Sequence, residues 1–226
     1  MKQVAGDNRL IKALLVSSFA SVFLYLVSAR YYGAGPFWFL NWNLVLAWLP
    51  LVFALLLIKY LKKNPWVSWA GALLTLLWLS FLPNSFYLIT DLVHLGYADP
   101  GQRLYYVIML FSFGFNGLVL GFLSLYLLHR ELLKRLKRAA AHSWVGLVLL
   151  LCSFAVYLGR YLRWSTWDVI LNPAGVLFDV SDRFINPVDY GQTFQVTALF
   201  FVLLGSMYFT LWHMIQATRQ DKTHNN

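Results

Sequence analysis

The sequence predicts an all-α membrane protein, a polytopic bundle of six transmembrane helices with both ends in the cytoplasm. Of the 226 residues, 60% are hydrophobic and only 12% are charged, whereas soluble domains are about half apolar and about one quarter charged. Six apolar runs are each long enough to cross a bilayer, which takes about 20 helical residues. Lys and Arg gather on alternate connections between these runs. We therefore expect one integral membrane domain, 1–226, located in the cell membrane.

The first predicted span covers residues 12–29. Basic residues precede it, and it ends in the tripeptide VSA, which resembles a signal-peptidase site. Its apolar stretch is long for a signal peptide, and the rest of the chain is multi-spanning. We therefore expect it to remain as an uncleaved span.

The remaining spans are predicted at 37–58, 67–88, 104–128, 144–162 and 194–215. The second and third each contain a proline, at Pro50 and Pro83. The fourth carries Gly117 and Gly121 in a G-x-x-x-G pair, which allows helices to approach closely. The six spans leave no room for a separate soluble domain.

The basic residues predict the orientation. With the N-terminus in the cytoplasm, 13 of the 18 basic residues fall on the cytoplasmic side, as the positive-inside rule requires. The outer segments hold Arg30, Arg103, Arg160, Arg163 and Arg183. The net charge of +9 thus reflects membrane orientation, with lipids as the expected partners. Nucleic acid is not an expected partner, because the aqueous surface is too small.

The longest connection, 164–193, is predicted to be extracytoplasmic and amphipathic. It contains two short amphipathic pieces, 166–171 and 175–185, each followed by an Asn-Pro dipeptide. These dipeptides are turn signals. We expect two short helices that lie on the membrane surface or dip into it as a lid.

A run of polar side chains follows Pro83. If 84–95 continue as an α-helix after a kink, Asn84, Tyr87, Asp91 and His94 fall within an arc of about 80°. Such a stripe faces protein or water rather than lipid, near the outer interface. Asp91 and His94 are candidate catalytic residues, since a histidine can act as a base that a carboxylate orients.

Two arginines stand at the outer end of the fifth span. Arg160 and Arg163 lie one helical turn apart there, so an anion is expected to pair with them. The options are Asp91, Asp168, a lipid phosphate or a ligand phosphate. Asp168 also has a structural explanation, because the sequence STWD at 165–168 fits a capping box with Ser165 as the N-cap.

Two further residues complete the predicted ligand-binding set. Tyr157 shares a helical face with Arg160, and Asn116 lies midway along the fourth span, where it could equally form an interhelical hydrogen bond. The full predicted set is Asn84, Tyr87, Asn116, Tyr157, Arg160, Arg163 and Asp168, with Asp91 and His94 as the catalytic pair.

No metal or cofactor is predicted. Asp91 and His94 are only two potential ligands, which do not make a metal site. The lone cysteine, Cys152, excludes an internal disulfide and every Cys-x-x-Cys pattern. No P-loop, Rossmann glycine motif or H-E-x-x-H motif is present.

Four stretches together resemble a known family. They are NLVLAWLP at 43–50, FLPNSFYLITDLVHL at 81–95, GFLSLYLLHR at 121–130 and YLGRYLRWSTWD at 157–168. They are similar to the bacterial membrane-protein family catalogued as domain of unknown function 1361, over about positions 40–215. The resemblance implies a multi-spanning membrane protein and carries no activity.

Three functions follow as hypotheses. The first is an outward-facing pocket between spans two, three, four and five, covered by 164–193, for an anionic lipid or lipid-linked headgroup. The second is a small transporter, although the apolar Leu73 and Leu74 in the inner half of span three argue against a polar path. The third is a scaffold without chemistry. Whether the chain is an enzyme, and whether its ionisable residues form only a structural network, stays open at this point.

Overall fold

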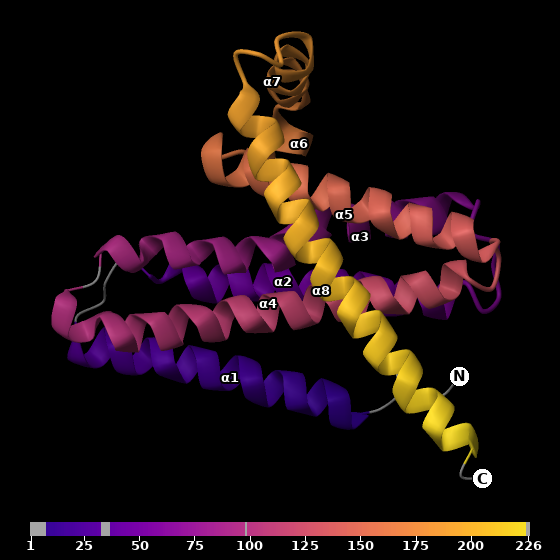
Figure 1. The fold of residues 1–226 in the computed structure, drawn as a ribbon, viewed down its shortest axis with the longest axis horizontal. Coiled ribbons are helices and arrows are strands. Elements are labelled where there is room, and N and C mark those ends of the chain that lie inside the picture. Colours follow the sequence, from indigo (N-terminus) through magenta and orange to yellow (C-terminus); the bar gives the residue numbers. More distant parts are fainter. Residues whose placement is uncertain (1–7, 33–36, 98, 225–226) are drawn as a thin grey trace. The chain divides into compact units, whose positions relative to one another are not determined.

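The computed structural model describes residues 8–32, 37–97 and 99–224, which form helices and, within these ranges, no strand (Figure 1). The all-α prediction is therefore confirmed. The chain divides into two compact units, Met1–Glu131 and Leu132–Asn226, and each is described in turn.

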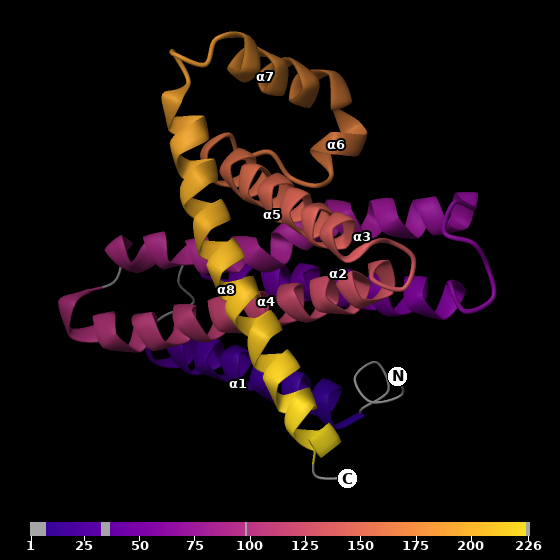
Figure 2. The same cartoon turned by 45° about the vertical axis from the view of Figure 1, so that its right-hand side comes forward.

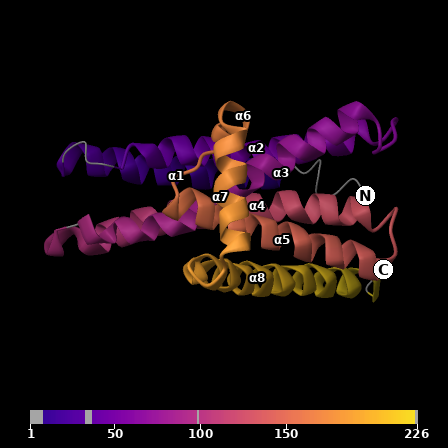
Figure 3. The ribbon, with the colours of Figure 1, turned by 90° about the horizontal axis from the view of Figure 1, so that it is seen from above.

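The described residues of unit 1 form four long helices and two 3-10 helices. They are α1 (Asn8–Tyr31), α2 (Phe39–Tyr60), α3 (Trp69–Tyr87), η1 (Leu88–Tyr97), η2 (Pro100–Gln102) and α4 (Arg103–Leu132). Figure 3 shows α1 to α4 running alongside one another.

Up to residue 224, where its described part ends, unit 2 forms two long helices joined by two short ones. They are α5 (Arg138–Tyr161), α6 (Asp168–Leu171), α7 (Pro173–Ile185) and α8 (Gly191–His224). Figures 1 and 2 show α6 and α7 beyond the ends of α5 and α8 that they connect.

Six segments of the described chain are long and apolar enough to cross a membrane, and each contains most of one predicted span. They are Arg9–Tyr31, Phe39–Tyr60, Trp69–Gly96, Pro100–Leu132, Arg138–Tyr161 and Gly191–Thr218. The chain is thus a multi-pass membrane protein. The largest difference at the start of a span is at α5, which begins at Arg138 rather than 144. The three alanines at 139–141 explain this early start, because alanine is the strongest helix former.

Glycines bring α4 against the end of α3 and the start of η1. A Cβ at Gly117 would overlap the carbonyl oxygen of Ser85, and one at Gly121 would lie 2.7 Å from Phe86 Cε1. A Cβ at Gly114 would lie 2.9 Å from Ile89 Cδ1. The predicted close approach at the glycine pair is therefore confirmed, and it extends one turn further to Gly114.

The core of unit 1 is apolar. Fully buried side chains from three elements meet there, including Leu40 and Ala47 of α2, Leu88 of η1, and Met109 and Phe113 of α4. One polar bond crosses this region, as the Ser85 hydroxyl donates to the Ala47 carbonyl at 2.9 Å. That carbonyl lies in the helical turn before Pro50, where a proline weakens the backbone ladder and Ser side chains commonly compensate.

The segment after Pro83 departs from the predicted α-helix. The α-helix continues through Pro83 to Tyr87, and a 3-10 helix then runs to Tyr97. The Thr90 hydroxyl donates to the Tyr87 carbonyl at 2.6 Å, and such side-chain bonds compete with the α-helical pattern. Since residues three apart eclipse in a 3-10 helix, Leu88, Asp91 and His94 align along one edge.

In unit 2, α5 and α8 form a packed helix pair. Buried residues of α5, including Leu149, Cys152 and Val156, match a buried stripe on α8 that includes Leu204 and Tyr208. Near the other end of the pair, the His142 ring packs edge-on against Trp212, with ring centroids 5.7 Å apart.

The two short helices expected within 164–193 are present. Asn172 ends α6 and begins α7, where its side chain accepts a hydrogen bond from the Gly175 amide at 3.1 Å. Pro173 occupies the first position of α7, which suits a residue without an N–H. Asn186 ends α7. Both Asn-Pro dipeptides therefore act as helix boundaries.

Candidate functional site

Asp91 is a buried acid at the end of a membrane span. Its side chain is 1% exposed on η1, within the candidate span Trp69–Gly96. The Asn43 amide of α2 donates to Asp91 Oδ2 at 3.4 Å. His94 Nε2 lies 3.9 Å from Asp91 Oδ1. The eclipsed geometry of η1 thus brings together the two predicted catalytic residues and adds Asn43, which sequence reasoning did not include in the site.

His94 is the more exposed member of the pair. Its side chain is 24% exposed, and its ring meets the edge of Phe39, with centroids 5.2 Å apart. The imidazole therefore has a carboxylate on one side, an aromatic wall on another and a partial opening. Histidine exchanges protons near neutral pH, and a neighbouring carboxylate can orient it and stabilise its cationic form.

The other two members of the predicted stripe precede η1. Asn84 and Tyr87 lie in the last turns of α3, and both are half-buried. The stripe therefore spans two consecutive helices with different periodicities.

Asn116 belongs to a buried hydrogen-bonding network between helices. Its Nδ2 donates to Ser21 Oγ and to the Ser112 carbonyl, both at 2.9 Å. The Ser18 hydroxyl donates to Asn116 Oδ1 at 3.4 Å, and Trp48 Nε1 donates to that hydroxyl at 3.1 Å. These bonds join α1, α2 and α4, so the structure favours the interhelical-bond interpretation of Asn116.

The predicted residues of α5 lie in unit 2. Tyr157 is buried and its ring stacks on Tyr161 at 5.2 Å, while Arg160 is half-buried in the last turn. The prediction that Arg163 lies one helical turn beyond Arg160 was wrong. Arg163 follows the helix with φ at 60°, in the left-handed region, where chains commonly leave a helix. Arg163 is exposed, and the chain turns at this residue, so that Trp164 does not continue helix α5.

Asp168 forms half of the predicted capping box. Its carboxylate accepts hydrogen bonds from the Ser165 amide at 2.7 Å and the Ser165 hydroxyl at 2.6 Å. These two bonds lower the pKa of Asp168. In a complete capping box the Ser165 hydroxyl would also accept a hydrogen bond from a backbone amide in the first turn of the helix. Here that hydroxyl instead donates to the Asp168 carboxylate, and helix α6 begins only at Asp168. Asp168 thus has a local structural role.

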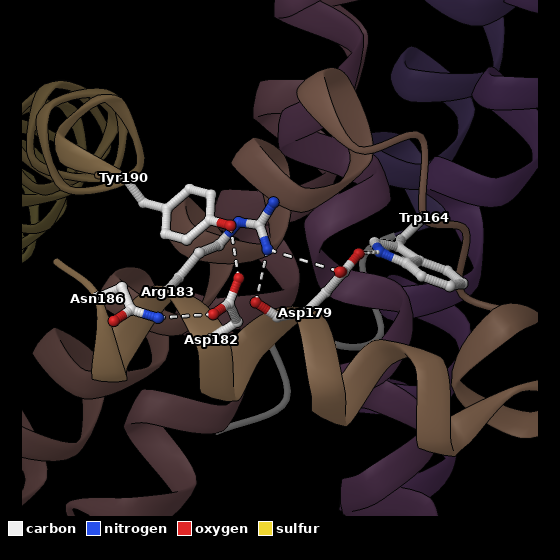
Figure 4. Close-up of polar contacts among 6 residues, drawn as sticks. All are labelled: Trp164, Asp179, Asp182, Arg183, Asn186 and Tyr190. Carbon is white, nitrogen blue, oxygen red and sulfur yellow. Dashed lines mark hydrogen bonds and ion pairs between the residues drawn. The ribbon is translucent and has the colours of Figure 1, made fainter. Parts of the chain in front are cut away.

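Sequence reasoning missed a polar cluster on α7 (Figure 4). Arg183 is only 6% exposed. Its Nη1 donates to the Asp179 carbonyl at 2.6 Å and lies 3.7 Å from Asp179 Oδ1. Its guanidinium lies over the Tyr190 ring, 4.7 Å from the centroid. Trp164 Nε1 donates to Asp179 Oδ2 at 2.7 Å.

Asp182 extends the cluster. It accepts hydrogen bonds from the Tyr190 hydroxyl and from Asn186 Nδ2. These bonds lower the pKa of Asp182, and the same contact with Asp182 raises the pKa of Tyr190. The signal for the cluster was the spacing of Asp179, Asp182 and Arg183, since residues three and four apart are neighbours on a helix. We call Trp164, Asp179, Asp182, Arg183, Asn186 and Tyr190 the α7 polar cluster.

The two sets of candidate residues lie in separate units. Unit 1 brings together Asn43, Asp91 and His94, whereas Arg160 and Arg163 belong to unit 2. Their role as ligands of an anion stays a prediction. Across the described residues, no three His, Cys, Asp or Glu side chains are grouped so that they could hold a metal ion.

Comparison with known proteins places the chain in a family. The model of a family described as "Protein of unknown function (DUF1361)" matches residues 42–219, which include Asn43, Asp91, His94 and the α7 polar cluster. Comparisons with curated proteins and with solved structures each found no match. The chain, a multi-pass membrane protein with a buried aspartate beside a half-buried histidine, belongs to the DUF1361 family.

Proposed function

We propose that this membrane protein binds a polar lipid headgroup at the site formed by Asn43, Asp91 and His94. The observation that carries the proposal is the carboxylate of Asp91, 1% exposed within a candidate membrane span and beside a partly open histidine. Ionisable residues are costly in membrane spans, at about 2.5–3.5 kcal/mol near the centre and less toward the interface, and they commonly mark functional sites.

The order of burial supports a ligand-facing role for His94. Asp91 is buried and accepts a hydrogen bond from the Asn43 amide, whereas about a quarter of the His94 side chain is exposed. In this arrangement His94 contacts the ligand and exchanges a proton with it, while Asp91 orients the imidazole.

The position within the span supports a headgroup as the ligand. The segment Trp69–Gly96 has 28 residues, more than the roughly 20 that cross the hydrocarbon core, and Asp91 and His94 lie close to its end. Imidazolium is a hydrogen-bond donor to phosphate. The ligand class that fits is an anionic lipid or a lipid-linked headgroup.

Arg160 and Arg163 form a separate part of the proposal. They stand at the end of another candidate span, Arg138–Tyr161, and the predicted topology puts the ends of the third and fifth spans on the same side of the membrane. Arginine binds phosphate in two-point contacts. In the proposal these two arginines bind the phosphate of the same class of lipid.

The binding test uses the purified full chain with phosphatidylglycerol, and with phosphatidylcholine as the neutral comparison. Native mass spectrometry should show that the wild type retains phosphatidylglycerol preferentially. Asp91→Asn and His94→Gln should each lower that retention by about tenfold, which corresponds to about 1.4 kcal/mol. Asp99→Asn, at an exposed acid in the same unit, is the control and should bind as the wild type does. Unchanged retention in both site variants would refute the proposal.

A complementation test then separates chemistry from packing. Asp91→Asn keeps the shape and the hydrogen bond with Asn43 but removes the charge. In cells that lack the gene, Asp91→Asn and Arg160→Ala should fail to restore the deletion phenotype at normal expression. Full restoration by both would refute a functional role for the pair and for the arginine.

A further inference from the structure

The short helix α7 exposes its apolar side, while its charged side has Arg183 buried and Asp179 and Asp182 half-buried. Leu177, Phe178, Phe184 and Ile185 are 60–75% exposed, whereas Arg183 is 6% exposed. A helix on the surface of a soluble protein has the opposite arrangement, with its apolar stripe toward the core. We call Leu177, Phe178, Phe184 and Ile185 the α7 apolar face; they are spaced at i, i+1, i+7 and i+8, which places them together on one side of the helix.

The α7 polar cluster determines which side of α7 is exposed. Asp179 is tied to Trp164, which precedes α6, and Asp182 is tied to Tyr190, which precedes α8 (Figure 4). Arg183 contacts both Asp179 and Tyr190. Because these bonds attach the polar side of α7 to the chain on both of its flanks, the helix cannot rotate to bury its apolar face.

We propose that α7 lies along the membrane surface with the α7 apolar face immersed at the boundary between lipid headgroups and acyl chains. Five residues, 186–190, connect α7 to the candidate span of α8. At about 3.5 Å per residue they reach less than about 20 Å, so α7 stays beside the bilayer. Apolar residues of α8 such as Leu199 and Val202 are also exposed, as lipid-facing positions of a span are, and the bilayer is therefore the occupant of the α7 apolar face.

The charge of α7 defines how it binds lipid. The helix carries Asp179 and Asp182 but only one basic residue, Arg183. Attraction to anionic headgroups, which drives basic amphipathic helices to membranes, is therefore missing here. Immersion comes from buried apolar area alone and should be independent of anionic lipid and of salt. This inference does not depend on the proposed function of Asp91 and His94.

The test places spin labels on the full chain in phosphatidylcholine nanodiscs. Phe178→Cys and Ile185→Cys probe the α7 apolar face, and Asp189→Cys, at an exposed position after α7, is the aqueous control. Cys152 stays in place because it is fully buried, and unmutated protein measures any background labelling. Electron paramagnetic resonance measures how often each spin label collides with oxygen, which concentrates in lipid, and how often it collides with a water-soluble nickel chelate.

Lipid immersion predicts a several-fold higher ratio of oxygen to nickel collisions at positions 178 and 185 than at 189. The ratio should stay the same when phosphatidylglycerol or salt is added. Nickel access at all three positions would show that the face lies in water. Protection from both reagents at 178 and 185 would show that protein, such as a second copy of the chain, covers it. Either result would overturn the proposal, and so would immersion that requires anionic lipid.

Discussion

Two buried polar residues of unit 1 illustrate two uses of polarity in a membrane span. Asn116 is 2% exposed, and its amide is engaged with serines of α1 and with its own helix. Asp91 is equally buried but adjoins a histidine that is partly open. The first arrangement joins helices, whereas the second retains a group that can meet a ligand.

Asn116→Leu should destabilise the protein without changing lipid retention. The substitution keeps the volume but removes the bonds to Ser18 and Ser21, and interhelical hydrogen bonds in membranes contribute about 0.6–2 kcal/mol. Thermal unfolding of the purified chain in detergent should show a lower midpoint. Ser206→Ala is the control, because that exposed hydroxyl bonds only to the Leu203 carbonyl of its own helix. Equal midpoints for Asn116→Leu and the wild type would contradict the role of the network.

Asp182 should make the local stability of α7 depend on pH. Hydrogen bonds from Tyr190 and Asn186 lower the pKa of Asp182 in the folded protein. Its contribution to stability is therefore present above its unfolded pKa of about 3.9 and is lost as the pH falls through the lower folded pKa. Hydrogen exchange at 173–190 should be faster in Asp182→Asn than in the wild type at neutral pH. The two should converge once Asp182 is protonated; a difference that persists at acid pH would contradict this.

At the scale of elements, small residues decide which helices meet. Gly114, Gly117 and Gly121 let α4 approach the junction of α3 and η1. This contact supports the segment that carries Asp91 and His94. The position of the candidate site therefore depends on side chains that have no chemistry of their own.

Gly117→Ala should destabilise the protein, whereas Gly146→Ala should not. A methyl group at 117 would overlap the backbone oxygen of Ser85, which cannot yield without moving α3, and such overpacking costs about 1–3 kcal/mol. A methyl group at 146 would meet nothing within 4 Å, so alanine should help the helix by up to about 1 kcal/mol. Unfolding midpoints in detergent measure both changes. A tolerated alanine at 117 would refute the close approach.

At the scale of the whole molecule, six crossings predict that both ends of the chain lie on one side of the membrane. The 13 basic residues of the predicted cytoplasmic segments indicate that this side is the cytoplasm. Reporter fusions that are active only in the cytoplasm should be active after residue 226 and in the 133–137 connection, and inactive within 186–190. Activity at 186–190 would reverse the orientation or change the number of crossings.

Much of the fold could be predicted because each span carries its own signal. Apolar runs of membrane length identify the six long helices, and the Asn-Pro dipeptides identify the ends of the short ones. The errors lie where neighbouring signals compete. Arg163 leaves the helix in a left-handed conformation, and Thr90 bonds to the backbone where a 3-10 helix replaces the predicted α-helix. Periodicity at 100° per residue cannot detect either change.

The sequence by itself determined the membrane class, the spans and the presence of polar residues after Pro83, since burial in lipid requires long apolar helices whatever their neighbours are. Only the tertiary structure decided which partners those polar residues take. It joined Asp91 to Asn43, engaged Asn116 with α1, and turned the charged side of α7 inward against Trp164 and Tyr190. The reason is physical: a polar side chain in an apolar surrounding must find a partner, but partners from distant helices are chosen by packing, which a single helical pattern does not contain.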